Sequence, residues 1–101
     1  MKDSERARRA LDRIRLSPLE RLVALALARR FESGLSLPEL VDSVYGGDAD
    51  GGPLGADAIV VRASRRLGHK LRATSELRLI RESAKRRLVW RKHRNQEETL
   101  P

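Results

Sequence analysis

Four nitrogen-bearing side chains recur at helical spacing in the second half of the sequence: Arg62, Arg65, His69 and Arg72. Intervals of three and four residues place side chains on one face of an α-helix, so these four are expected to form a row. A guanidinium group donates two parallel hydrogen bonds to a planar acceptor pair, such as two phosphate oxygens or the O6 and N7 atoms of guanine. The row therefore indicates binding to phosphates or base edges.

The positive charge is concentrated in one third of the chain. Residues 61–94 hold thirteen Lys or Arg against two acids, whereas residues 31–60 hold six acids and no Lys or Arg, in a chain of net charge +8. A contiguous basic segment suits a polyanion, and double-stranded DNA is the expected partner. We expect Arg62, Arg65 and His69 to read base edges. Phosphate contacts are expected from Arg66, Arg72, Lys85, Arg86 and Arg87.

Composition limits the classes of protein that fit. At 101 residues the chain has room for one modest core, and it lacks the cysteines that disulfides or thiolate metal sites require. Its longest apolar run, Leu22 to Ala28, is too short to cross a bilayer, which needs about 20 residues, and its charged N-terminus does not match a secretory signal. We therefore expect a cytoplasmic, nucleoid-associated protein with no membrane partner.

No motif predicts catalysis, a metal or a cofactor. The acidic segment beginning at Asp48 resembles a calcium loop only at its start, because Pro53 and Ile59 stand where glycine and glutamate are required. His69 and His93 have no cysteine or carboxylate partner at ligand spacing. The sequence offers no serine, histidine and acid set for nucleophilic chemistry, so we expect a protein that is not an enzyme.

Three helix starts precede the basic segment. Asp3 or Ser4 is expected to cap a helix over 4–15, whose thin apolar stripe would pack on the domain or on a second subunit. Ser17-Pro18-Leu19-Glu20 and Ser36-Leu37-Pro38-Glu39 are capping boxes with proline in the first turn, and they predict helices from Pro18 to about Phe31 and over 37–45. The Ser36 helix start offers backbone N–H groups that could clamp a phosphate.

The rest of the sequence, from residue 46 onward, predicts a loop, a helix and a hairpin. Five glycines and a proline make residues 46–55 a flexible acidic loop. From Ala56 a third core helix carries the row of four on its outer face. Alternating apolar positions predict strands over 77–82 and 87–91 around a cationic tip at 83–86, with Trp90 packed inward. Residues 1–16 would thus form an N-terminal helical arm, 17–92 the domain and 93–101 a polar tail.

This order of elements is that of a mainly α, α+β winged helix-turn-helix: three core helices, a C-terminal hairpin wing and an extra N-terminal helix. In that fold the third helix enters the major groove and the wing contacts the backbone or minor groove. We therefore expect a transcription regulator that binds double-stranded DNA in a sequence-specific manner.

Residues 16–91 resemble the OmpR/PhoB-type winged-helix effector domain of bacterial response regulators. The resemblance implies DNA contact through the third helix and wing, and a loop before the third helix that can touch RNA polymerase; here that loop carries Asp48 and Asp50. No receiver domain precedes these residues, so a stand-alone regulator without phosphorylation control is expected. The wing departs from the family in lacking its glycine-rich turn. The matching segments are Leu16-Ser17-Pro18-Leu19-Glu20, residues 37–46, residues 65–71 and Leu79-Ile80-Arg81.

Two other functions fit the same charge pattern. The protein could be an architectural or recombination accessory factor that bends DNA, or a protein-interaction module whose basic face meets an acidic partner. DNA bending assays and the salt dependence of binding separate these from a regulator. One winged helix makes few base contacts, so a homodimer or tandem binding at repeated half-sites would add specificity. The sequence leaves the operator and the sign of regulation open.

Overall fold

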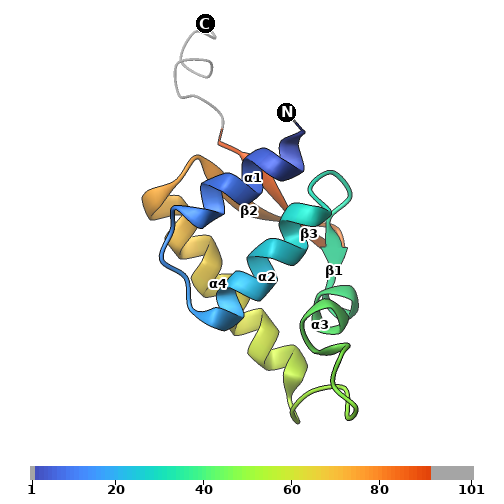
Figure 1. Cartoon of the computed structure of the whole chain (residues 1–101). Coiled ribbons are helices and arrows are strands. Elements are labelled where there is room, and N and C mark those ends of the chain that lie inside the picture. Colours follow the sequence, from blue (N-terminus) through green and yellow to red (C-terminus); the bar gives the residue numbers. More distant parts are fainter. Residues whose placement is uncertain (1, 92–101) are drawn as a thin grey trace, which may run out of the picture.

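The computed structural model describes residues 2–91, which fold into four helices and a three-stranded antiparallel sheet (Figure 1). The class is α+β, as expected, and the hairpin is the last element within the described residues. The predicted tail over 93–101 lies outside the described residues. None of the described helices is long and apolar enough to span a membrane. The elements are α1 (Asp3–Asp12), α2 (Pro18–Arg29), β1 (Leu35–Ser36), α3 (Leu37–Tyr45), α4 (Ala56–Thr74), β2 (Leu77–Glu82) and β3 (Lys85–Trp90).

Both predicted capping boxes form. The Ser17 Oγ accepts a hydrogen bond from the Glu20 N–H at 3.2 Å, and the Glu20 carboxylate accepts one from the Ser17 N–H at 3.0 Å. The same reciprocal pair joins Ser36 and Glu39, at 3.3 and 2.8 Å. These bonds satisfy donors that a helix start otherwise leaves free, and for this reason α2 and α3 begin where the sequence places them.

The N-terminal helix differs from its prediction at both ends. Lys2 is its N-cap residue and makes no side-chain capping bond, so neither Asp3 nor Ser4 caps it. The helix also ends at Asp12, before the predicted Arg15. Its apolar stripe packs on its own domain, because Ala7 and Leu11 are fully buried in the common core.

The hairpin is tighter than predicted. Strands β2 and β3 pair in register from Leu77↔Trp90 to Glu82↔Lys85, so the turn consists of Ser83 and Ala84 alone. The prediction of a cationic tip was wrong, since Lys85 and Arg86 are the first residues of β3. In β3 the apolar alternation begins only at Leu88, so the pattern did not reveal that the strand starts at Lys85.

No sequence pattern predicts the third strand. Five residues separate α2 from the short β1, which pairs with β3 through Leu35↔Arg86, and the sheet order is β1-β3-β2. Helix α2 ends two residues before the predicted Phe31. At the approach to β1, Gly34 has φ +72°, and a Cβ there would lie 2.7 Å from the Arg86 carbonyl oxygen, so glycine permits this pairing.

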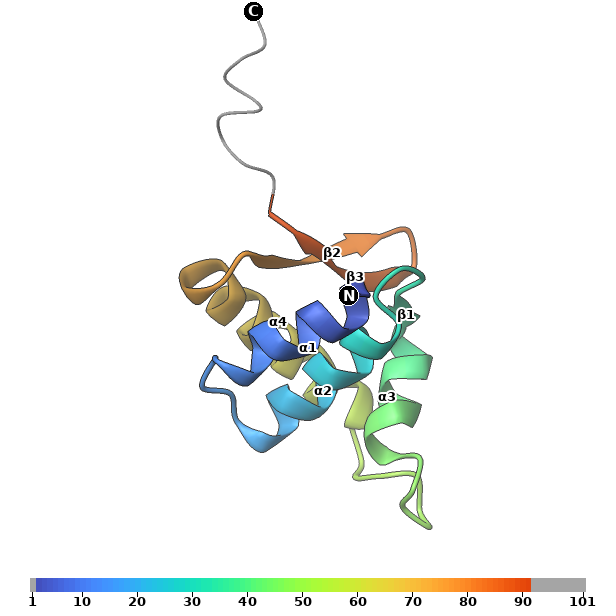
Figure 2. The same ribbon diagram turned by 45° about the horizontal axis from the view of Figure 1, so that its top comes forward.

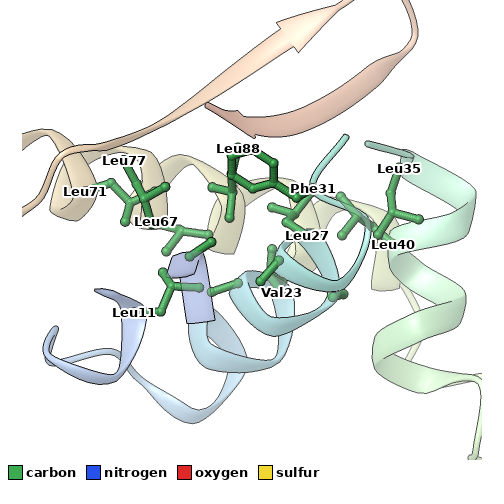
Figure 3. Close-up of a cluster of buried hydrophobic side chains, with 14 of the residues drawn as sticks. Leu11, Val23, Leu27, Phe31, Leu35, Leu40, Leu67, Leu71, Leu77 and Leu88 are labelled. Carbon is green, nitrogen blue, oxygen red and sulfur yellow. The ribbon is translucent and has the colours of Figure 1, made fainter. Parts of the chain in front are cut away.

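One core joins every element. Figure 3 shows leucines of α1, α2, α3, α4 and both hairpin strands meeting between the helices and the sheet. In Figures 1 and 2, α1 and α2 form the front layer and α4 passes behind them. Trp90 packs inward as expected, with its ring centroid 6.0 Å from that of Phe31 and the Arg6 guanidinium carbon 4.6 Å from its ring centroid.

Candidate nucleic-acid interface

Helix α4 has one buried face and one charged face. Val60, Ala63, Leu67 and Leu71 are fully buried against the core, and the buried Ser64 hydroxyl donates to the Val60 carbonyl at 2.9 Å. The helix therefore cannot rotate without exposing these side chains, and its opposite face is fixed toward solvent. Exposed on that face are the four predicted residues Arg62, Arg65, His69 and Arg72.

A groove runs between the exposed face of α4 and the hairpin. Its polar lining consists of five arginines, one histidine and one serine, with no carboxylate, and the cationic groups come from three separate elements. Gly68 is part of the lining, and a Cβ there would lie 3.9 Å from the Leu79 side chain, in ordinary van der Waals contact. The lining residues are Val61, Ser64, Arg65, Gly68, His69, Arg72, Arg78, Leu79, Ile80, Arg81 and Arg86.

The structure brings together three of the predicted helix residues and one of the predicted wing residues in this groove. Arg65, His69 and Arg72 line it from α4, and Arg86 lines it from β3. Arg62 is exposed on the same face of α4 but is not part of the lining.

Sequence reasoning missed two arginines of β2. Arg81 lines the groove and is exposed, directly across the hairpin from Arg86. Arg78 also lines it, but its Nη1 donates to the carbonyls of Leu71, Ser75 and Leu77 at 3.2, 2.8 and 2.7 Å. Arg78 therefore ties the end of α4 to β2. The strand period of two could have assigned Arg81 to the face of Leu79, toward the helix.

Arg66 has a different position from the other cations of α4. Its Nε donates to Glu20 at 3.0 Å, and Lys70, one turn later, forms an ion pair with the same carboxylate, which is 2% exposed. Burial alone would raise the pKa of Glu20, but hydrogen bonds from Lys70, the Ser17 N–H and Arg66 outweigh burial and lower it from 4.5 to about 2. Arg66 thus connects α4 to α2, on the side away from the groove.

The two remaining wing cations also lie off the groove. Arg87 alternates with Arg86 along β3, and its guanidinium donates to the Glu82 carboxylate at 2.7 Å. Hydrogen bonding to Arg87 lowers the pKa of Glu82. Lys85 is exposed at the end of the strand, across from Glu82. Arg87 is therefore compensated by a carboxylate of the hairpin.

The start of α3 offers few donors for a phosphate. The N–H groups of Ser36 and Glu39 are taken by the capping box, and Pro38 between them has none. The Glu39 carboxylate also occupies this end of the helix, and hydrogen bonds from the Ser36 backbone and side chain lower its pKa. A second anion there would meet a negative charge, so the expected phosphate clamp at Ser36 has little to support it.

The acidic loop lies far from the groove's hairpin end. Residues 46–55 connect α3 to α4 at the end of α4 opposite the wing (Figures 1 and 2). Asp48 and Asp50 are exposed in it, and Leu54 in the same loop is fully exposed. The loop therefore presents acid and one apolar side chain together on a surface separate from the cations.

Within residues 2–91 the structure holds no group of three or more His, Asp or Glu placed to bind a metal ion. No protein-family model matches the chain, and neither a curated protein nor a solved structure shows significant similarity to it.

Proposed function

We propose that this protein is a double-stranded DNA-binding transcription regulator with a winged helix-turn-helix fold. In this interpretation α3 and α4 form the helix-turn-helix, α4 is the recognition helix, and β2 with β3 is the wing. The observation that carries the proposal is the acid-free groove in which cations from α4, β2 and β3 line one surface. A surface of this kind matches a phosphate backbone, whose contacts are dominated by Lys and Arg.

The position of the cations on α4 favours reading of the major groove. An α-helix fits that groove, and each base pair displays a distinct pattern of donors and acceptors there. Arg62 and His69 lie on the exposed face of α4, about two turns apart, where they could reach successive base pairs. Arg72 lies one turn beyond His69, near the end of the helix, and suits a phosphate contact.

The experiment is selection of bound sequences from a random duplex pool at near-physiological salt. The selected duplex is then titrated against a scrambled duplex of the same length. We expect an enriched motif, bound at least about a thousandfold more tightly than the scrambled duplex. Tight, salt-sensitive binding without a motif would instead favour an architectural DNA-binding protein, and the bend angle of the bound duplex would then be measured. Absence of DNA binding would contradict both functions.

The exposed acidic loop supports a second contact, with a basic surface of the transcription machinery such as RNA polymerase. Leu54 is the feature that favours it, because a fully exposed leucine in a loop that also carries two exposed acids can anchor a partner that the acids orient. Replacing Leu54 with Ser, together with Asp48→Asn and Asp50→Asn, should leave DNA affinity unchanged and reduce transcription from a dependent promoter. An unchanged promoter output would contradict this contact.

A further inference from the structure

Two arginines face each other across the hairpin without a carboxylate between them. Arg81 and Arg86 are direct cross-strand partners and line the same groove. Side chains opposite each other on an antiparallel pair have Cβ atoms about 5 Å apart, and like charges in this position destabilise the sheet. The next pair outward, Glu82 and Lys85, has opposite charges, so the hairpin contains a favourable pair directly beside the unfavourable one.

A third guanidinium joins this pair from α4. Arg65 lines the groove with Arg81 and Arg86, so the cluster combines a helix and both strands of the wing. Partial burial of Arg86 lowers its pKa, and the charges of Arg81 and Arg65 lower it further. Within residues 2–91 no carboxylate lies within 4.0 Å of any of the three. The folded protein alone therefore leaves their mutual repulsion uncompensated.

We propose that Arg65, Arg81 and Arg86 jointly hold one phosphate group of the DNA backbone at the junction of α4 and the wing. This inference rests on the proposed function, and it changes the expected role of Arg65 from base reading to phosphate binding. Three guanidinium groups from separate elements can surround one tetrahedral phosphate. Its negative charge compensates the repulsion among the three positive charges, which remains in the free protein. Leu79 and Ile80 also line this groove and add apolar surface to it.

Arg81→Thr is the variant that tests the site. Threonine suits an exposed strand position, and the substitution removes the like-charge pair, so Tm measured without DNA should rise by a few degrees. Affinity should fall about tenfold on the selected and the scrambled duplex alike, and the slope of log K against log salt should become less steep by about 1. A gain in stability together with a loss in binding is not expected from a residue that only supports the fold.

Arg87→Thr is the matched control, because it makes the same chemical change on the same hairpin. Arg87 has its own carboxylate partner, with its Nε 2.7 Å from Glu82, and it is not part of the groove lining. We expect its removal to lower Tm and to change DNA affinity by less than about threefold, the opposite of the Arg81→Thr result.

Arg65→Lys tests the change of role. A lysine still neutralises a phosphate as a point charge but cannot reproduce a bidentate bond to a base, so the variant should keep its preference for the selected sequence. Loss of that preference would return Arg65 to base reading and overturn the shared site. An unchanged affinity in Arg81→Thr, while the wild type still prefers the selected duplex, would overturn the shared site and leave the proposed function standing. A wild type that binds no duplex would overturn both.

Discussion

The Arg66 Nε lies 3.0 Å from a carboxylate oxygen of Glu20, a residue that also closes the capping box at the start of α2. One buried side chain therefore sets the beginning of α2 and holds α4 against it. Lys70 shares the same carboxylate, so two of the cations of α4 are engaged on its inner side. The cations on the outer side of α4 are the ones to which we assign DNA binding.

Glu20→Gln should destabilise the protein by about 2 kcal/mol at pH 7, as measured by urea denaturation. The full pKa difference between 4.5 and about 2 would correspond to more, but Arg66 and Lys70 are 53% and 40% exposed, and water compensates them in part. Because the folded-state pKa is depressed, this stabilisation is complete above about pH 4.5 and is lost as the pH falls toward 2. The difference in stability between wild type and variant should shrink over this interval, and a constant difference would show that the carboxylate charge is not its source.

Arg62→Ala should relax the sequence preference of the protein. Arg62 is exposed on the outer face of α4 and has no carboxylate within 4.0 Å among the described residues. We expect a loss of about 1 to 3 kcal/mol on the selected duplex and a much smaller loss on scrambled DNA, measured by fluorescence anisotropy. Equal losses on both duplexes would assign Arg62 to the backbone.

Trp90→Ala should detach α1 from the domain. The indole contacts the Phe31 ring, lies 4.6 Å from the Arg6 guanidinium carbon and donates to the Asp3 carboxylate at 3.4 Å. Its loss should cost about 3 kcal/mol, and amide hydrogen exchange should accelerate in α1 before it does in α4. Trp90→Phe, which retains an aromatic ring, serves as the milder control. Unchanged exchange in α1 would refute this role.

Ser83→Gly should stabilise the hairpin. Ser83 has φ 57°, and it is the one residue other than glycine with positive φ in residues 2–91. A left-handed conformation costs an L-residue about 1 to 2 kcal/mol and glycine almost nothing, although glycine loses more entropy on folding. We expect a net gain of about 0.5 to 1 kcal/mol in thermal denaturation, without a change in DNA affinity. A lower Tm would mean that the serine side chain stabilises the turn.

Features set by neighbouring residues could be predicted from the sequence. The boxes at Ser17 and Ser36 close over three residues, so they locate the starts of α2 and α3. The four exposed residues of α4 follow from the helical period and from a core stripe that is itself regular. Both signals are local and do not depend on what the chain packs against.

Features set by distant residues could not be predicted. Strand β1 exists because Leu35 pairs with Arg86, and a two-residue strand has no periodicity to detect. The second role of Glu20 depends on partners 46 and 50 residues away. Arg81 pairs with Arg86 because the hairpin turn has two residues rather than four. A longer turn would have shifted the register of β2 against β3.

The central claim is that duplex DNA binds in the groove between α4 and the wing. Its most direct test is titration of the ¹⁵N-labelled protein with the selected duplex, following backbone amides and arginine Nε–H signals by NMR. We predict that the largest shifts belong to Arg62, Arg65, His69, Arg72, Arg81 and Arg86, with α1 and the loop over 46–55 nearly unchanged. Shifts confined to α1 and α2, or no shifts at all, would contradict the claim.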